Sequence, residues 1–496
     1  MGKSISHSYS PLPFWLSSLE GYRSRLGRGL VSGWPRTSRM KLNMNSTRRT
    51  GLLVLLLSSG LFIVWGSFIE HTSSGGMADF KAIYFGARCV IHHSDPYKEA
   101  EFLCVYRAEG GVIPFDPTVS MLFLRAVPVC INLPTALFIV APFSFLGWGP
   151  AHVLWMFLTA ACLMLSSFLA WTLAADWAPG VSLFLICIAL ANSEILFSGG
   201  NLAGIAVSLC VMAVWCFLKD RFVPAGALCL AVSLAFKPHD AGLVWLYFLL
   251  AGGVYRKRAL HTLVVAVLLS VPAVLWVSHV APNWMQELHS NLSATSGHGD
   301  LNDPGPASIA FHNVNMVVDL QSVVGVFRDD PRIYNPITYL VCGALLLMWS
   351  IRTVRSRFSQ ASAWFALAAV APLSLLPVYH REYDAKLLLL TVPACAMLWA
   401  GGDTLRWLAL LLNTAGIVLT GDIPAAILVL LTRNLHLNTG ELIGQILTVV
   451  LIRPAPLVLL AMAIFYLWVY LRRAFYPPPS AERGGYGQEG PARVTA

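Results

Sequence analysis

Long apolar runs constrain this chain more than any other feature of its sequence. Residues 52–69 and 259–277 are apolar almost throughout. Each is long enough to cross a bilayer as a helix, which needs about 20 such residues. Strands of an outer-membrane barrel would instead alternate apolar and polar residues with a period of two. The runs therefore predict membrane-spanning helices and exclude a barrel.

The composition agrees with a polytopic membrane protein. Of the 496 residues, 56% are hydrophobic and 12% are charged, whereas soluble domains carry about 25% charged residues. A soluble enzyme, a collagen-like chain, a disordered chain and a disulfide-built scaffold are all excluded. We expect an all-α polytopic bundle of about 11–13 transmembrane helices with two sizeable external loops. The expected segments are 51–69, 131–147, 151–171, 181–197, 201–218, 223–236, 240–254, 259–278, 335–351, 361–378, 386–400, 405–420 and 453–471.

The net charge of +9 is spread along the chain and does not form a patch, so a nucleic-acid partner is not expected. Basic clusters border the apolar runs, which is the positive-inside pattern. Residues 70–118 contain seven acids and four bases, and residues 281–333 contain six acids and two bases. We therefore predict that these two loops are external, that the N-terminus is cytoplasmic and that the protein lies in the cell inner membrane.

Three regions follow from this pattern. Residues 1–50 are predicted to be a basic cytoplasmic extension, residues 51–473 the transmembrane domain and residues 474–496 a disordered cytoplasmic tail. Counting spans forward from the first one, and backward from the basic cluster at 256–258, places residue 200 on opposite sides of the membrane. One segment between 119 and 200 must therefore be re-entrant, broken or interfacial, and residues 423–452 are too short for two clean spans.

The first external loop contains the strongest candidate for a catalytic group. Asp79 follows the first span closely, at the boundary between water and lipid, where a carboxylate is placed to act as a general base on a lipid-borne substrate. The same loop continues with Tyr84, Arg88, Asp95 and Tyr97. Taken alone, Asp79 also fits a solvated loop acid.

Two further groups of polar residues end apolar runs on the side assigned as external. Lys237 and His239 flank a proline and together suit a phosphate at headgroup depth, although a snorkelling lysine has the same pattern. Residues 380–384 read His-Arg-Glu-Tyr-Asp. This segment fits either a solvated turn or a site in which an arginine fork binds phosphate or carboxylate.

Amide and histidine side chains elsewhere on this side suit recognition of sugar hydroxyls, although surface loops use the same residues. These are Asn201 after two glycines and, in the second external loop, His312, Asn313 and Gln321. There is no metalloprotease motif, phosphate-binding loop or nucleophile elbow in the sequence. A transporter would place polar groups near the bilayer midplane, whereas here they gather at one interface.

These motifs resemble family 87 of the glycosyltransferases, in the GT-C class, over roughly residues 51–400. The likeness is carried by Asp79-Phe80, Tyr84, Ala87-Arg88 and Asp95-Pro96-Tyr97, and by Ala225-Gly226 followed by Lys237-Pro238. The chain departs from the family pattern at Gly199-Gly200-Asn201, at Leu320-Gln321-Ser322 and at residues 379–384.

The resemblance implies a GT-C-like bundle and a metal-independent, inverting transfer of a hexose, typically mannose, from a polyprenyl-phosphate sugar to an external glycan or glycolipid. Asp79 would be the base, and Lys237 would stabilise the departing phosphate with help from His239, His380 or Arg381. Tyr383 would contact the substrate. No cofactor is implied. The alternatives are a transporter or flippase of a polyprenyl-linked sugar, and a non-catalytic partner in envelope assembly.

Overall fold

The computed structural model describes residues 44–72, 76–111, 130–308, 317–422, 427 and 441–473. The chain divides into two compact units, Met1–Leu52 and Leu53–Ala496. Of the first unit, the structure describes only the opening turns of helix α2. The second unit contains all the other described residues. The predicted extension 1–50 and tail 474–496 lie almost wholly outside the described residues.

The described part is helical, as predicted, and its only strand-like feature is an isolated bridge between Val317 and Arg381. Six helical segments are long and apolar enough to cross a membrane. They are α2 (Met44–Thr72), α7 (Trp148–Ala174), α8 (Pro179–Leu190) continued by α9 (Ile195–Ser198), α13 (Gly253–Val280), α16 (Pro331–Arg355) and α22 (Pro454–Arg473). The expected total of 11–13 spans stays a prediction.

Shorter helices complete the bundle. Five are apolar: α6 (Pro134–Ser144), α10 (Ala203–Lys219), α11 (Val223–Phe236), α19 (Leu405–Leu419) and α21 (Leu442–Leu451). The others are α12 (Pro238–Leu250), α17 (Gln360–Ser374), the 3₁₀ helix η1 (Asp384–Thr391) and α18 (Val392–Ala400).

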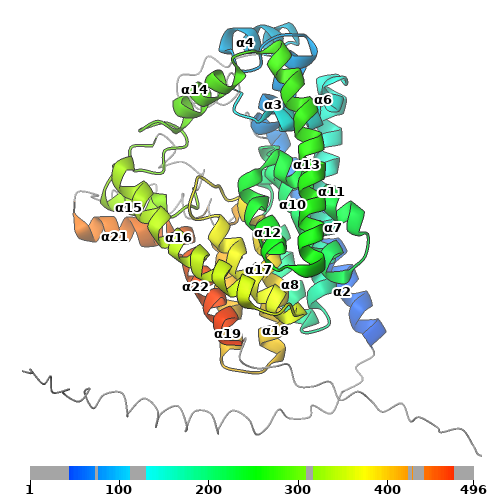
Figure 1. The fold of residues 1–496 in the computed structure, drawn as a ribbon, viewed down its shortest axis with the longest axis vertical. Coiled ribbons are helices and arrows are strands. Elements are labelled where there is room, and N and C mark those ends of the chain that lie inside the picture. The colour runs from blue at the N-terminus through cyan, green and yellow to red at the C-terminus, as the bar shows by residue number, and fades with distance from the viewer. Residues whose placement is uncertain are drawn as a thin grey trace, which may run out of the picture. The chain divides into compact units, whose positions relative to one another are not determined.

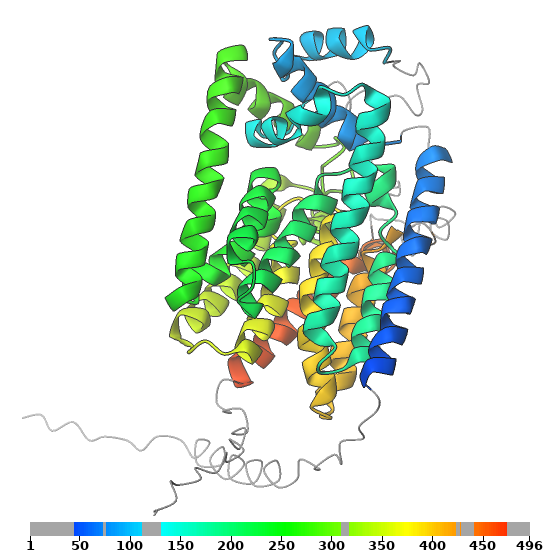
Figure 2. The same cartoon turned by 90° about the vertical axis from the view of Figure 1, so that its right-hand side faces the viewer.

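The two predicted external loops contain helices of their own. These are α3 (Ala78–Ile91) and α4 (Glu99–Ala108) in the first loop, and α14 (Trp284–Ser296) and α15 (Gln321–Phe327) in the second. Helices α3, α4 and α14 gather at one end of the second unit, and α18 and α19 lie at the other (Figures 1 and 2). Helix α13 ends at Val280, close to the first group. Parts of both loops therefore meet at the same end.

Helix α6 offers an answer to the parity problem between residues 119 and 200. It has 11 residues and contains Pro142, so it is about 16 Å long at 1.5 Å per residue. The hydrocarbon core is about 30 Å thick. Helix α6 is therefore too short to span. The run 181–197 keeps the length of a span, although its helix is interrupted between Leu190 and Ile195.

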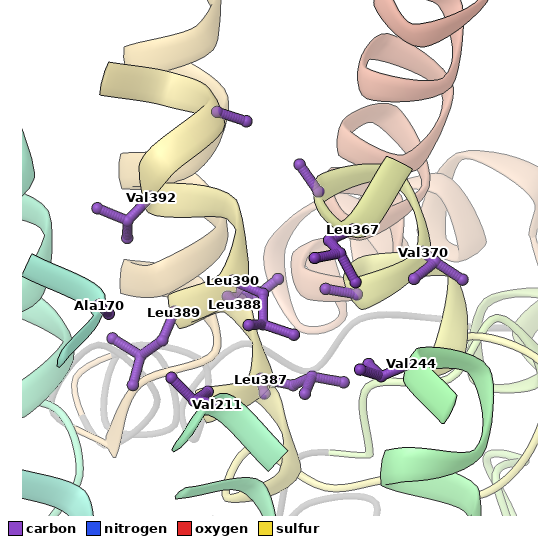
Figure 3. Close-up of a cluster of buried hydrophobic side chains, with 14 of the residues drawn as sticks. Ala170, Val211, Val244, Leu367, Val370, Leu387, Leu388, Leu389, Leu390 and Val392 are labelled. Atoms are coloured by element: carbon purple, nitrogen blue, oxygen red, sulfur yellow. The ribbon is translucent and has the colours of Figure 1, made fainter. Parts of the chain in front are cut away.

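The centre of the second unit is the segment that begins with η1. Every residue from 380 to 398 is buried. Leu387 to Leu390 pack against Val211 of α10, Val244 of α12 and Leu367 and Val370 of α17 (Figure 3). Between helices in a membrane such contacts act through close packing rather than through loss of water. This packing anchors the polar residues 380–384, which come directly before.

Candidate active site

Helix α3 is docked by its first turn onto the loop between α9 and α10. The backbone N–H of Met77 donates to the carbonyl of Ser198 at 2.6 Å, and that of Asp79 to the carbonyl of Gly199 at 2.9 Å. Gly200 has a φ of +65°, and a Cβ there would lie 2.8 Å from both Met77 Sδ and Phe80 Cβ. Only glycine fits this close approach. The loop therefore fixes where Asp79 begins the helix.

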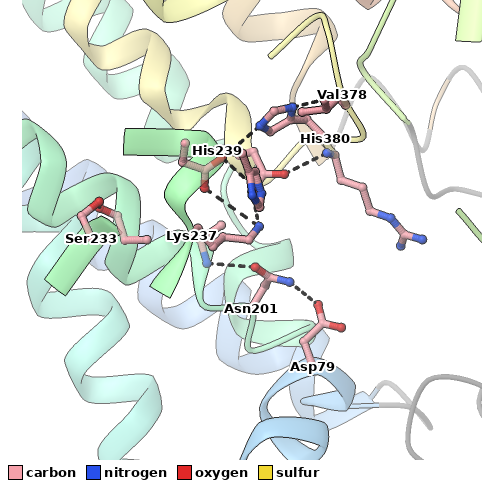
Figure 4. A network of polar contacts seen from close by, with 12 residues as sticks. Asp79, Asn201, Ser233, Lys237, His239, Val378 and His380 are labelled. Carbon is pink, nitrogen blue, oxygen red and sulfur yellow. Dashed lines mark hydrogen bonds and ion pairs between the residues drawn. The ribbon is translucent and has the colours of Figure 1, made fainter. Parts of the chain in front are cut away.

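Asn201 orients the Asp79 carboxylate. Its Nδ2 donates to Asp79 Oδ2 at 2.7 Å, while its Oδ1 accepts from the backbone N–H of Ala203 at 2.8 Å (Figure 4). Because the N–H can only donate, the amide must present its NH₂ to Asp79. Among the described residues no hydrogen bond is formed by Asp79 Oδ1, and the side chain is half-buried. That oxygen can accept a proton from a bound hydroxyl.

Lys237 occupies the junction between α11 and α12, and its ammonium turns into the protein. Nζ is 2.5 Å from Asp384 Oδ1 and 4.0 Å from Asp240 Oδ2, and it lies 4.8 Å from the centre of the Tyr383 ring. The Lys237 side chain is 14% exposed. It is therefore not a snorkelling lysine, and two carboxylates already balance its charge.

The segment 380–384 is a buried turn and not a solvated one. Its backbone is tied to the 317–320 strand-like stretch, since Val318 N donates to the His380 carbonyl and Leu320 N to the Leu376 carbonyl, both at 2.9 Å. Asp384 Oδ2 accepts from the backbone N–H of Arg381 at 3.0 Å. These bonds present the side chains of the turn toward Lys237 and α12.

Among the described residues, Arg381 forms no ion pair with a carboxylate. Its guanidinium donates to Asn302 Oδ1 at 3.0 Å and lies 5.5 Å from the centre of the Tyr379 ring. Within the described ranges, no carboxylate lies within 4.0 Å of Arg381, and its Nε has no hydrogen bond. Arg381 therefore keeps donors and a charge that a phosphate or carboxylate ligand can use.

The charges of Asp79, Arg381 and Lys237 all act on one tyrosine. Burial raises the pKa of Tyr379 to about 12; Arg381 and Lys237 oppose this, whereas Asp79 adds to it. Burial likewise raises the pKa of Glu382 to about 8, although Arg381 lowers it. The predicted base and the two cations therefore all lie within electrostatic reach of Tyr379.

Seven of the predicted site residues are brought together in this way: Asp79, Asn201, Lys237, His239, His380, Arg381 and Tyr383. The two imidazole rings lie 4.9 Å apart, and both face Asp240. Their Nε2 atoms are 3.8 Å (His239) and 3.2 Å (His380) from Asp240 Oδ1. Burial lowers the pKa of His380, but Asp240 and Asp384 outweigh that effect and leave it raised.

Four predicted residues of the first loop are engaged elsewhere. The Tyr84 hydroxyl donates to the Leu146 carbonyl, and Arg88 pairs with Glu109. Asp95 Oδ1 accepts from the backbone N–H of Tyr97, whose hydroxyl donates to the Asn132 carbonyl. These contacts brace α3 and α4 against the segment around α6. Substrate binding by these four residues stays a prediction.

The predicted residues of the second loop are only partly described. Gln321 donates to Asn335 Oδ1 at 2.7 Å and lies near the Pro377 carbonyl, so it contacts the segment that leads into the turn. His312 and Asn313 lie outside the described residues. Sequence reasoning did not single out Asp240 or Asn302 as site residues. The only signal for Asp240 was its spacing of three residues from Lys237 on one helix.

A second group of buried charges lies beyond the turn. Lys386 Nζ donates to the Asn192 carbonyl, and Asp422 Oδ2 accepts from the backbone N–H of Ile195. Burial raises the pKa of Asp422, and Lys386 lowers it. Glu194 joins this group through Asp422. One lysine thus faces several carboxylates inside the bundle.

Comparison with known proteins identifies one family. Residues 131–377, about half of the chain, match glycosyltransferase family 87. Asn201, Lys237, His239 and Gln321 lie inside the matched residues, whereas Asp79 and the buried turn lie outside them. No curated protein and no solved structure matches the chain.

Proposed function

We propose a reaction for this chain on the premise that it belongs to glycosyltransferase family 87 and is a glycosyltransferase with membrane-spanning helices. The donor is a polyprenyl-phosphate hexose, with mannose as the first sugar to test. The acceptor is a hydroxyl of a glycan or glycolipid on the external side of the inner membrane. The observation that supports this most is a carboxylate oriented by Asn201 whose charge acts on Arg381, an arginine with no carboxylate within 4.0 Å among the described residues.

The proposed step is an inverting displacement with Asp79 as general base. Asp79 Oδ1 takes the proton of the acceptor hydroxyl as its oxygen attacks the anomeric carbon of the sugar. The bond from that carbon to the phosphate oxygen breaks, and polyprenyl phosphate leaves with the electron pair. Asn201 positions the base by holding the other carboxylate oxygen.

We assign the departing phosphate to Arg381 rather than to Lys237. The Lys237 ammonium is already paired with Asp384 and lies 4.0 Å from Asp240, so its charge is used within the protein. Arg381 offers a planar fork without an acidic partner among the described residues. A fixed cation at the leaving oxygen is among the largest contributions to catalysis. Lys237 acts as a positioning residue, because Asp384 links it to the backbone of Arg381.

Release of polyprenyl phosphate is the test of this proposal. Purified protein in lipid nanodiscs is incubated with labelled polyprenyl-phosphate mannose and membrane extract as the acceptor source. An active transferase releases polyprenyl phosphate and labels an acceptor. Arg381→Gln should raise the KM for the donor or abolish release, with Arg381→Lys between the two, whereas the control Arg406→Gln should behave as wild type. Equal donor use by all variants would contradict the assignment of Arg381.

A transporter or flippase for a polyprenyl-linked sugar is the second candidate. The buried group of Lys386, Glu194 and Asp422 favours it, because ionisable residues inside membrane proteins often line transport pathways. Such a protein would move labelled donor between the leaflets of a vesicle without releasing polyprenyl phosphate. The same labelled donor therefore separates the two functions.

A further inference from the structure

The pair of histidines beside Asp240 has a geometry that the proposed transfer does not explain. His239 Nε2, Asp240 Oδ1 and His380 Nε2 converge, and these atoms lie within 4.8 Å of one another. Asp240 and His380 are 0% exposed. The centroids of the two imidazole rings, both labelled in Figure 4, lie 4.9 Å apart. From this geometry we propose that His239, Asp240 and His380 bind a divalent first-row transition metal ion of the Zn²⁺ class.

The hydrogen bonding of His380 provides the first argument. His380 Nδ1 lies 2.9 Å from the Val378 carbonyl oxygen. A carbonyl oxygen can only accept, so Nδ1 carries the hydrogen and Nε2 of the neutral ring presents a lone pair. A backbone carbonyl that fixes the distal nitrogen in this way is the usual support of a metal-binding histidine.

The second argument is that this lone pair faces another acceptor. His380 Nε2 is 3.2 Å from Asp240 Oδ1, and two acceptors at that distance repel each other unless a proton or a metal ion lies between them. Within the described part of the chain, the two Asp240 carboxylate oxygens and His380 Nε2 have no hydrogen-bond partner. Lys237 is paired with Asp384 and lies 4.0 Å from Asp240 Oδ2, so one of these two buried negative charges can still be offset by a cation at Asp240 Oδ1.

The distances suit a tetrahedral ion after a small movement. Bonds of about 2.0–2.2 Å to nitrogen and oxygen place tetrahedral ligand atoms about 3.3–3.6 Å apart. Asp240 Oδ1 is 3.2 Å from His380 Nε2 and 3.8 Å from His239 Nε2. The His239 side chain is 39% exposed, so its ring can turn inward by the remaining distance. Water or a substrate oxygen would occupy the fourth position.

A second His/Asp group of the described residues makes a useful contrast. His298, Asp303 and Asp329 also lie close together. There, however, Asp303 already accepts from the backbone N–H groups of Gly299 at 2.6 Å and Gly305 at 2.9 Å. Those bonds satisfy the carboxylate without a metal. His298 therefore provides a matched control.

The test uses the full chain in detergent and does not depend on transferase activity. Protein is treated with chelator and titrated with Co²⁺, whose visible absorption reports four-coordinate binding. Wild type should bind one ion per chain, and added Zn²⁺ should displace it. His239→Ala removes an exposed ligand and should fold. It should weaken Co²⁺ binding by more than the roughly 10–100-fold that loss of an outer-shell partner costs, whereas His298→Ala should bind as wild type.

Three results would overturn the proposal. They are no Co²⁺ spectrum in folded wild-type protein, equal binding by His239→Ala and wild type, and loss of binding only in His298→Ala. In the first case a protonated His380 would neutralise Asp240 in place of a metal, and nitrogen-15 NMR of the histidine rings would show the imidazolium. Loss of Co²⁺ binding in His380→Ala with unchanged thermal unfolding would support the metal site independently.

Discussion

Replacing Lys237 by methionine separates its structural role from direct contact with substrate. The methionine keeps much of the side-chain volume but removes the ammonium. The side chains of Asp384 and Asp240 are 1% and 0% exposed, so Lys237→Met leaves buried carboxylates without their nearest cation. Breaking a buried ion pair by removing one partner costs about 3–5 kcal/mol.

That energy corresponds to a measurable change in unfolding temperature. Unfolding entropy is about 2.1 cal/mol/K per residue, which for a cooperative chain of 496 residues gives about 1 kcal/mol/K. Lys237→Met should therefore lower the midpoint by about 3–5 °C. The double variant Lys237→Met/Asp384→Asn removes one of the two carboxylates left unpaired and should recover about half of the fall in the midpoint.

Thermal unfolding in detergent and donor-dependent release of polyprenyl phosphate are measured on the same preparations. If Lys237 positions the turn that contains Arg381, the double variant regains transfer in proportion to its stability. Recovery of stability without any transfer would refute this reasoning, because it would place the ammonium on the substrate. A midpoint for Lys237→Met equal to that of wild type would refute the energetic argument.

Two further predictions concern the residue that orients the base, Asn201, and the buried acid Asp319. Asn201→Ala removes a hydrogen bond to a carboxylate worth about 1.5–3 kcal/mol, so kcat/KM should fall roughly 10- to 150-fold while the chain stays folded; an unchanged kcat/KM would mean that Asn201 does not orient Asp79. Burial raises the pKa of Asp319 to about 7, although the bond from Ser322 lowers it. The folded chain therefore holds a proton there that the unfolded chain releases, and this contribution to stability is full below about pH 4 and lost as the pH rises through about 7. Unfolding midpoints should accordingly fall less between pH 5 and 8 for Asp319→Asn than for wild type, and parallel curves would contradict the shift.

Sequence patterns predicted the helices of the bundle well. The run 223–236 coincides with α11, and 405–420 differs from α19 by one residue. These apolar runs could be located well because charged or turn residues mark their ends. Helices α3 and α14 were not predicted, since both loops were interpreted through their charge. Helix α3 nevertheless buries Phe80, Ile83, Tyr84 and Ala87 at helical spacing, and that signal was available.

The candidate site could be predicted only as separate pieces. Asp79 is joined to Asn201 across 122 positions of the chain, and Lys237 to Asp384 across 147. The distribution of charged residues placed all four on the external side of the membrane. It did not show which residues pair, because pairing depends on how the helices pack. For the same reason the segment 380–384 also fitted a solvated turn. Its burial follows from the packed leucines of η1, whose partners come from α10, α12 and α17.

The most direct test of the proposed function is the transfer reaction of Asp79→Asn. General bases typically contribute about 10²–10⁴-fold to the rate. The variant should insert and unfold as wild type but release polyprenyl phosphate at least about 100-fold more slowly, while Asp176→Asn, at an exposed site on another loop, keeps full activity. If Asp79→Asn releases polyprenyl phosphate at the wild-type rate, Asp79 is not the base and the proposed site is wrong.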